Sequence, residues 1–425
     1  MKDKGLILLL LLILPSLLYS QKQPEGIIIL KADRIFDGYE THDNWVVAVE
    51  DNKIVYAGPE KKFGSQVTTI NLPGTTLMPG MIEGHSHVLL HPYNETDWND
   101  QILKESHAER VARAVNHLKA NLLAGFTTLR DLGSEGAGYS DVGLRTAIEK
   151  GVIPGPRLLV AGPAIVATGS YGPKGFHSGF TVPLGAEEAD GIDNLIKVVR
   201  RQIGNGVDIV KVYADYRWGP NKSAEPTFTI DELKLIVEVA ESSGRKVVAH
   251  AATAEGMRRA TLAGVSTIEH GDGGTAEVFQ LMKENNVALC PTIAAGEAIS
   301  QYKGWQKGTR PFPERVISKR KSIELAIASG VEIVAGGDVG VFPHGTNVTE
   351  LELMVEYGFK TWEVLQYITS GNALLLNLSD LGVLKEGALA DIIAVEGNPQ
   401  KEISDLRNVV FVMKEGDIYK SPENQ

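Results

Sequence analysis

Between residues 76 and 335, the chain alternates two patterns of hydrophobic and polar positions. Short apolar runs are typical of buried strands, and the stretches between most of them repeat apolar residues every three or four positions, as amphipathic helices do. The predicted strands are residues 76–87, 127–130, 158–161, 209–213, 246–250, 266–270, 288–292 and 332–335. The clearest predicted helices are residues 105–124, 189–205, 230–244, 275–286 and 313–330.

This alternation predicts an α/β fold, a closed (β/α)8 barrel of the TIM-barrel type. A doubly wound open sheet is the competing architecture. The barrel is favoured because residues able to bind a metal follow several of the strands. In a barrel, all carboxyl ends of the strands meet at one mouth.

The two ends of the chain share a different pattern. Short β-rich runs bounded by Gly, Asp and Asn occupy residues 26–71, and similar runs return at residues 390–395 and 409–413. Such runs are typical of antiparallel strands. We expect residues 21–78 and 384–425 to pair into one small sheet domain, with residues 79–383 forming the barrel.

The first twenty residues have the pattern of a signal peptide. A charged start precedes an apolar run from Gly5 to Leu14, and Ser20 is a small residue suited to cleavage. A retained membrane anchor is the weaker alternative, because Pro15 ends the run well short of about twenty apolar residues. We therefore expect cleavage after Ser20, a periplasmic or secreted protein, and no stable membrane anchor afterwards.

Composition limits the cellular compartments and the classes of partner that fit this chain. The single cysteine, Cys290, lies in an apolar run and can form no internal disulfide, which fits a bacterial periplasm or secreted fraction better than a disulfide-stapled domain. A formal net charge of −11 and the lack of a basic run argue against nucleic acid as a partner. A small-molecule substrate is expected, and the sequence leaves homo-oligomerisation open.

Several predicted strands end in residues able to bind a metal. His85 and His87 share one face of the first strand, about 7 Å apart. The other candidates are Lys211 in the fourth strand, His250 and His270 at the ends of the fifth and sixth, and Asp338 after the eighth. Each alone has an ordinary structural explanation, such as a buried ion pair or a helix cap. Six candidates on five strands that share one mouth predict a metal site.

These motifs resemble the amidohydrolase superfamily, and within it the group around imidazolonepropionase and the metal-dependent prolidase-like dipeptidases. The resemblance is carried by residues 79–87 (PGMIEGHSH), 125–131 (GFTTLRD), 155–158 (GPRL), 207–213 (VDIVKVY) and 384–393 (LKEGALADII). It extends from about Gly26 to the C-terminus. In that family the terminal segments form a small β-sandwich beside the barrel, so the resemblance implies a sandwich here.

The resemblance also implies a binuclear metal centre, usually zinc, bridged by a carboxylated lysine. Carried over, one ion takes His85, His87, Lys211 and Asp338, and the other takes Lys211, His250 and His270. Lys211 would be N6-carboxylysine, formed with CO2, because a protonated lysine is a poor metal ligand. Imidazole and carboxylate ligands suit zinc, with manganese or cobalt as alternatives.

The implied reaction is hydrolysis of an amide-like carbon–nitrogen bond. A hydroxide between the two ions would attack a carbonyl group that one ion polarises. Asp338 would take the proton of that hydroxide and pass it to the leaving amine.

Loops after the strands are expected to choose the substrate. Residues 167–177 form a glycine-rich stretch long enough to cover the mouth. Prolidase-like relatives often place a histidine at the position of Tyr171 and use it with an aromatic residue at the position of Tyr213. Tyr171 and Tyr213 are therefore the predicted substrate contacts, with packing at the rim as the alternative. His344 is a third candidate, with helix capping as its alternative.

The leading hypothesis is an exported metal-dependent amidohydrolase that cleaves dipeptides, Xaa-Pro-like ones among them, or small N-acyl amino acids. The main rival is a cyclic-amide hydrolase such as imidazolonepropionase, or a lactonase on the same site, although export fits the cytoplasmic role of imidazolonepropionase poorly. A third hypothesis is a non-catalytic scaffold that has lost its metals. Competent residues at all six ligand positions argue against it.

Overall fold

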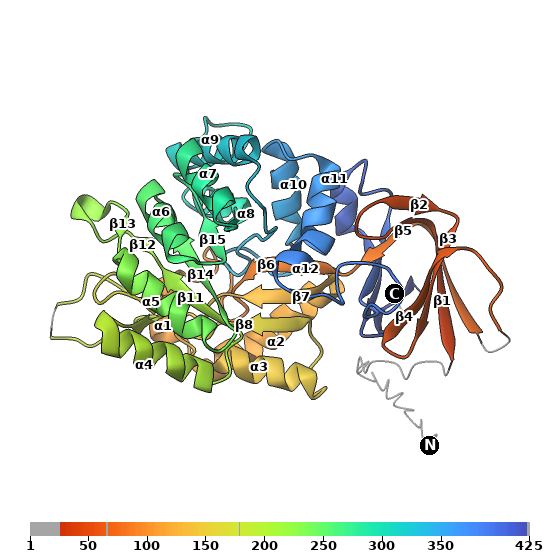
Figure 1. Ribbon diagram of the computed structural model, residues 1–425, viewed down its shortest axis with the longest axis horizontal. Helices are drawn as coiled ribbons and strands as arrows, with labels where there is room; N and C mark the ends of the chain where they lie inside the picture. Colours follow the sequence, from red (N-terminus) through yellow and green to blue (C-terminus); the bar gives the residue numbers. More distant parts are fainter. Residues whose placement is uncertain (1–25, 65–66, 178, 423–425) are drawn as a thin grey trace, which may run out of the picture.

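The computed structural model describes residues 26–64, 67–177 and 179–422. They form a sheet built from both chain ends and an α/β region built from the middle of the chain, side by side in Figure 1. The predicted signal peptide, residues 1–20, lies outside the described residues. Within the described ranges, no helix is both long and apolar enough to cross a membrane.

Both ends of the chain contribute strands to one eight-stranded sheet. Its order is β19-β18-β17-β5-β1-β3-β4, with β2 paired to β1. The strands are β1 (Ile27–Phe36), β2 (Thr41–Asp43), β3 (Trp45–Glu50), β4 (Lys53–Pro59), β5 (Val67–Pro79), β17 (Ile392–Glu396), β18 (Val409–Lys414) and β19 (Asp417–Lys420). β5 joins the two halves, because it runs parallel to β1 and antiparallel to β17.

The middle region contains two parallel sheets. The first consists of β6 (Met81–Ser86), β7 (Phe126–Asp131) and β8 (Arg157–Val160). The second has the order β10-β9-β11-β14-β15-β16, made of β9 (Ile165–Val166), β10 (Glu187–Glu188), β11 (Ile209–Tyr213), β14 (Lys246–Ala251), β15 (Thr267–His270) and β16 (Ala288–Cys290). A small antiparallel pair, β12 (Asp215–Tyr216) and β13 (Glu225–Pro226), follows β11.

Backbone hydrogen bonds connect the two parallel sheets at both edges. On one side, the Asp208 N–H donates to the Val160 carbonyl at 2.8 Å. On the other side, residues 332–339 make backbone contacts with both β16 and β6. One of these is the 2.9 Å bond from the Gly84 N–H to the Ala335 carbonyl.

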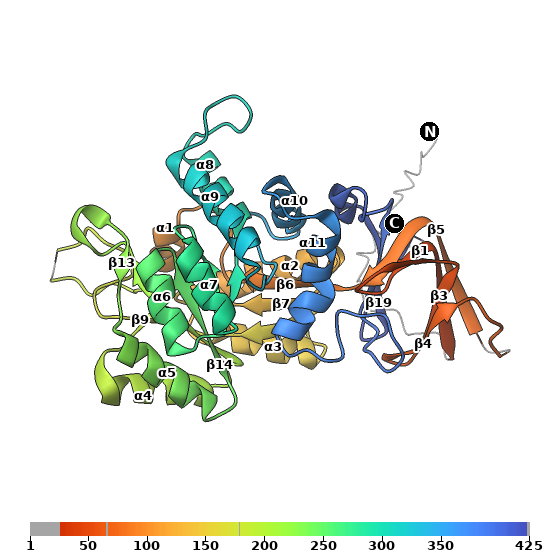
Figure 2. The same cartoon turned by 45° about the horizontal axis from the view of Figure 1, so that its top comes forward.

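Helices cover the outside of these strands, as Figure 2 shows for α4 to α7. Five helices confirm the predicted ones: α2 (His107–Leu123), α4 (Gly191–Gly204), α5 (Ile230–Glu241), α7 (Ala276–Glu284) and α9 (Glu314–Ser329). The others are α1 (Trp98–Lys104), α3 (Ser140–Glu149), α6 (Ala254–Ala263), α8 (Ile293–Tyr302), α10 (Val348–Glu356), α11 (Thr361–Gln366), α12 (Asn372–Leu375) and the short helices η1 (Pro220–Lys222), η2 (Tyr367–Gly371) and η3 (Ile403–Arg407).

Local sequence explains where several helices begin and end. Thr229 and Glu232 form a capping box at the start of α5, in which each side chain accepts the other's backbone N–H. α6 and α9 end at Gly264 and Gly330, whose φ angles of +89° and +67° suit glycine.

The first predicted strand, residues 76–87, is in fact two strands. The chain changes hydrogen-bond partners at Gly80, whose N–H donates to the Asp391 carbonyl of the terminal sheet. The next N–H, of Met81, donates to the Gly125 carbonyl in the α/β region. Residues before Gly80 therefore belong to β5, and those after it to β6.

The eighth predicted strand, residues 332–335, is extended but not a regular strand. Its backbone makes only isolated contacts with β16 and β6. At Ala335 the Asn372 side chain adds two hydrogen bonds, because it accepts the Ala335 N–H at 2.9 Å and donates to the Ala335 carbonyl at 2.8 Å. Cys290 is a free, fully buried cysteine as expected, and its Sγ lies 3.6 Å from the Gly336 carbonyl.

We expect Gly84→Ala to destabilise the junction between β6 and residues 332–339. An added Cβ would lie 2.4 Å from Val334 Cγ1 and 2.6 Å from the Ala335 carbonyl oxygen, and such overpacking costs about 1–3 kcal/mol. Thermal denaturation followed by circular dichroism should show a lower melting temperature. Gly143→Ala in α3 is the control, because nothing lies within 4 Å of its added Cβ. Equal melting temperatures for Gly84→Ala and the wild type would show that Val334 and Ala335 can move aside at no cost in stability.

Candidate active site

The six metal-ligand candidates lie together at the carboxyl ends of the strands. They are His85 in β6, His87 just after it, Lys211 in β11, His250 in β14, His270 at the end of β15 and Asp338 after residues 332–335. Ring centroids are 5.3 Å apart for His85 and His87, 5.3 Å for His85 and His270, and 4.5 Å for His250 and His270. Asp338 Oδ1 lies 3.6 Å from His85 Nε2 and 3.3 Å from His87 Nε2.

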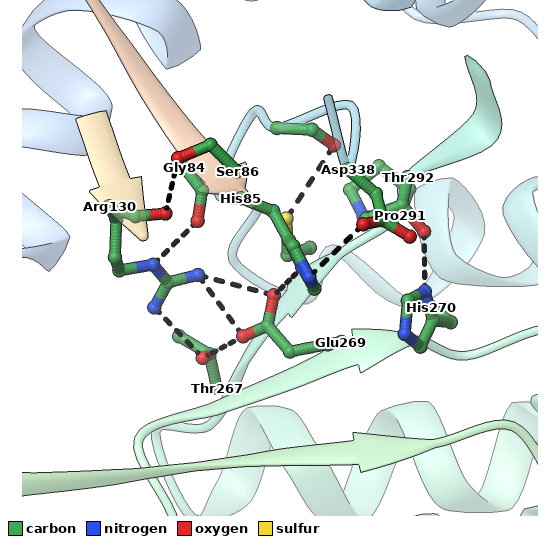
Figure 3. A network of polar contacts seen from close by, with 12 residues as sticks. Gly84, His85, Ser86, Arg130, Thr267, Glu269, His270, Pro291, Thr292 and Asp338 are labelled. Atoms are coloured by element: carbon green, nitrogen blue, oxygen red, sulfur yellow. Dashed lines mark hydrogen bonds and ion pairs between the residues drawn. The ribbon is translucent and has the colours of Figure 1, made fainter. Parts of the chain in front are cut away.

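Hydrogen bonds at Nδ1 fix three of the histidine rings. The pairs are His85 with Glu269 Oε2 at 2.8 Å, His87 with the Gly133 carbonyl at 3.0 Å, and His270 with the Thr292 hydroxyl at 2.8 Å. Figure 3 shows the first and the third of these pairs. A hydrogen on Nδ1 leaves the lone pair on Nε2, where it can bind a cation.

Two buried atoms in this cluster have no hydrogen-bond partner within the described chain, His85 Nε2 and Asp338 Oδ1. Buried polar atoms are seldom left without a partner, because that costs free energy. One ligand atom each from His85, His270 and Asp338 lies within 4.8 Å of the others. Imidazole nitrogens and a carboxylate oxygen in this arrangement fit a divalent cation such as zinc.

Burial favours the neutral form of three of the histidines, His85, His250 and His270. It lowers the pKa of His85 to about 4, and the nearby charge of Lys211 acts in the same direction. The pKa values of His250 and His270 also lie well below the usual one, first because of burial. Neutral imidazole is the form that binds a metal.

Lys211 is buried among these groups, with 1% of its surface exposed. Burial lowers its pKa, although the carboxylates of Glu269 and Asp338 oppose the shift. A lower pKa raises the fraction of neutral amine, which is the nucleophilic form of lysine.

The sequence analysis did not single out Glu269, a buried carboxylate behind the histidines. Its oxygens accept hydrogen bonds from Arg130 Nη2 at 3.1 and 3.3 Å and from His85 Nδ1 (Figure 3). Burial alone would raise the pKa of Glu269, but Arg130, His85 and Lys211 together hold it below its usual value. The signal in the sequence was an acid inside a strand, directly before a candidate ligand.

The backbone is strained at three residues of the cluster. The φ angles of His270, Thr292 and Asp338 are +78°, +48° and +64°. Residues other than glycine rarely adopt such angles, least of all one that branches at Cβ, such as Thr292. Strain of this kind gathers at functional sites, where the surrounding structure maintains it.

Comparison with known proteins identifies the family, because residues 76–419 match the model of the Amidohydrolase family. This chain belongs to the amidohydrolase family. It is 30% identical to ochratoxinase of Aspergillus niger over 419 residues, which cover 89% of this chain and 83% of the relative.

Two solved structures share most of this amidohydrolase's fold. A crystal structure of an Xaa-Pro dipeptidase with methionine bound in the active site has a TM-score of 0.83 and 30% identity, covering 93% of this chain and 100% of the other. The structure of A. niger ochratoxinase has a TM-score of 0.79 and 28% identity, covering 94% and 97% of the two chains. The chain is thus a hydrolase that acts on carbon–nitrogen bonds, as the sequence analysis predicted.

Tyr171 and Tyr213 of this amidohydrolase lie beside the histidines. The Tyr213 ring stacks on His250 with centroids 4.5 Å apart, and the Tyr171 ring lies 4.7 Å from that of Tyr213. The Tyr171 hydroxyl donates to Glu135 Oε2 at 2.8 Å. Their position beside the histidines is compatible with a substrate contact, which stays a prediction.

His344 is engaged by other parts of the chain. Its Nε2 lies 3.0 Å from the Leu90 carbonyl, its Nδ1 lies 3.1 Å from the Asn121 amide nitrogen, and its ring stacks on His117 with centroids 4.2 Å apart. Both ring nitrogens are thus used within the chain in this arrangement. A substrate contact through His344 stays a prediction.

We expect Glu269→Gln to weaken both the fold and metal binding. The variant leaves the Arg130 guanidinium buried without its counter-charge, which costs about 3–5 kcal/mol. Loss of the carboxylate behind His85 should lower metal affinity by about 10- to 100-fold. Urea denaturation and titration with zinc would measure the two effects, with the exposed Glu324→Gln in α9 as control. Unchanged stability and unchanged affinity would show that Glu269 supports neither.

Proposed function

We propose that this amidohydrolase is an exported, metal-dependent enzyme that cleaves dipeptides, Xaa-Pro-like ones among them, or small N-acyl amino acids. The observation that carries the metal dependence is that two buried atoms, His85 Nε2 and Asp338 Oδ1, have no hydrogen-bond partner among the described residues. Similarity to an Xaa-Pro dipeptidase supports the substrate class. The apolar run from Gly5 to Leu14 supports export to the periplasm or the medium.

We also propose that the two parallel sheets close into one (β/α)8 barrel, with a β-sandwich formed by the chain ends. The hydrogen bonds at both sheet edges support closure, as does similarity in fold to other amidohydrolases. A closed barrel would bring all the strand ends to one mouth.

In our proposal the residues of the cluster hold two divalent zinc ions, a choice that the imidazole and carboxylate donors support. One ion would be held by His85, His87, Lys211 and Asp338, and the other by Lys211, His250 and His270. Bound ions would supply Lewis acidity at the scissile carbonyl and would lower the pKa of the attacking water.

In this proposal, Lys211 carries a carboxyl group derived from CO2. Its amine nitrogen forms a bond to the carbon of CO2 and loses a proton, which yields an anionic carbamate. The burial that lowers the pKa of Lys211 supports this step, because the neutral amine is the reactive form. The carbamate would replace a poor ligand with anionic oxygens.

Asp338 would move the proton of the reaction. Its Oδ1 has no hydrogen-bond partner in the described chain and lies 3.3 Å from His87 Nε2. The Asp338 N–H donates to the His85 carbonyl at 2.9 Å, which fixes the turn that presents the carboxylate. It can therefore accept a proton from the attacking water and donate it to the leaving amine nitrogen.

The proposed function is tested by amine release from a panel of Xaa-Pro dipeptides, other dipeptides and N-acetyl amino acids. The protein is supplied with zinc and bicarbonate, and we expect hydrolysis of one subset that a chelator abolishes. Asp338→Asn is the matched control, which should keep much of its metal and lose most of its turnover. Silence across the panel, with metal shown to be bound, would contradict the proposal and direct attention to cyclic amides or lactones.

The bridging role of Lys211 is tested by Lys211→Ala. We expect a folded protein with little bound metal and an activity lower by more than about 100-fold. Removing a metal ligand should lower activity more than removing a residue that only hydrogen-bonds to a ligand, which costs about 10- to 100-fold. Small carboxylic acids should restore part of the activity, because they supply the missing carboxylate. Metal content and hydrolysis rate are measured beside the exposed Lys197→Ala. Full metal content and full activity in Lys211→Ala would refute the bridge.

A further inference from the structure

A buried carboxylate, Glu135, lies beside the candidate metal site in the loop after β7. It is 3% exposed, and its Oε2 accepts hydrogen bonds from the Tyr171 hydroxyl at 2.8 Å and the Trp98 indole at 2.9 Å. A Cβ added to Gly133 would lie 3.2 Å from Glu135 Oε1 and 3.3 Å from His87 Cε1. Glu135 Oε1 therefore lies on the His87 side of the cluster.

Glu135 has no ion-pair partner within the described ranges of the chain. The buried guanidinium of Arg110 contacts this loop, but it donates to the backbone carbonyls of Glu135 at 2.7 Å and Ser134 at 3.2 Å. Arg110 thus fixes the loop through its backbone and forms no salt bridge with the carboxylate, although the nearby Glu135 charge opposes the lowering of the Arg110 pKa by burial. The φ angle of Glu135, +47°, is a strained conformation that this anchoring maintains.

A cation, Arg217, lies at the other end of the same aromatic cluster. It follows β12, is exposed, and donates from Nη2 to the Tyr216 hydroxyl at 3.2 Å. The Tyr216 ring lies 4.8 Å from that of Tyr171 and 5.9 Å from that of His250. Arg217 forms no salt bridge with any acid among the residues that the structure describes. It is therefore a cation on the His250 side of the cluster, available to an anion.

The site thus has an anionic pole near His87 and a cationic pole near His250. Tyr171 lies between them, because it contacts Glu135 through its hydroxyl and Tyr216 through its ring. A molecule that crosses the histidine cluster between these poles needs a positive group at one end and a negative group at the other. An unblocked dipeptide has both, and its peptide bond lies between them.

We propose that Glu135 binds the α-ammonium group and Arg217 the α-carboxylate of an unblocked dipeptide. This inference rests on the proposed function and narrows it, because N-acyl amino acids lack the ammonium group. Glu135 is the stronger determinant, since a charge pair is strengthened where water is excluded. Arg217 is exposed, so its pairing with the carboxylate is weaker.

The test uses three forms of one dipeptide that the wild type cleaves: free, N-acetylated, and amidated at the C-terminus. For the wild type, acetylation should lower kcat/KM by about 30- to 100-fold, as for loss of a buried charge partner. Amidation should lower it by about 5- to 10-fold, as for an exposed charge-assisted contact.

A variant at Glu135 should lose only the preference for a free amine, and a variant at Arg217 only the preference for a free carboxylate. Glu135→Gln should lose rate on the free dipeptide but little on the acetylated one, and Arg217→Gln should lose rate on the free acid but little on the amide. Glu135→Asp, which retains the charge, should regain part of the preference for a free amine. Glu238→Gln and Arg200→Gln, at exposed positions on α5 and α4, are the controls and should match the wild type.

The outcomes separate this inference from the proposed function. Equal wild-type rates on free and blocked dipeptides would overturn the inference and leave amide hydrolysis intact. The same holds if Glu135→Gln and Glu135→Asp lose rate equally on all three forms, since that indicates a structural role. Failure of the metal-loaded protein to cleave any amide would overturn the proposed function, and this inference with it.

Discussion

The rest of the site depends on the buried contact between Arg130 and Glu269. Both side chains are withdrawn from water, so the pair is stable only if its other hydrogen-bonding groups are also satisfied. Arg130 meets this condition with the Gly84 carbonyl and the Thr267 hydroxyl, and Glu269 with His85 Nδ1. Three strands, β6, β7 and β15, are thereby linked by side-chain hydrogen bonds. The His85 ring is fixed as a result, with its Nε2 toward Asp338.

The sequence predicted the parts of this molecule that follow from periodicity and from strand ends. A short stretch of sequence is enough to show whether a segment is a strand or a helix, and whether a histidine follows a strand. Arg130 and Glu269 are 139 positions apart, and nothing near either residue shows that they meet. The extended segment before Asp338 looked like a regular strand, yet at Ala335 it also bonds to the Asn372 side chain, which periodicity cannot reveal.

Charges around the histidines divide into two kinds. Glu269 is neutralised by Arg130 and serves to orient a ring, whereas Glu135 and Arg217 form no salt bridge with any described residue. Burying a carboxylate such as Glu135 without a salt bridge costs stability, and the ammonium binding that we propose would offset that cost. The aromatic residues between the two charges offer each one a neutral hydrogen-bond partner, the Tyr171 hydroxyl to Glu135 and the Tyr216 hydroxyl to Arg217, but no opposite charge.

The switch of hydrogen-bond partners at Gly80 bears on how the chain matures. β5 leads through this one residue into β6, which carries His85, and its antiparallel neighbour β17 comes from the last part of the chain. The terminal sheet therefore cannot be completed until residues 392–420 have been synthesised. A chain cut short before β17 would leave one edge of β5 bare, next to the strand that presents the histidines. The support of the strand that presents the histidines thus depends on β17, a segment synthesised long after it.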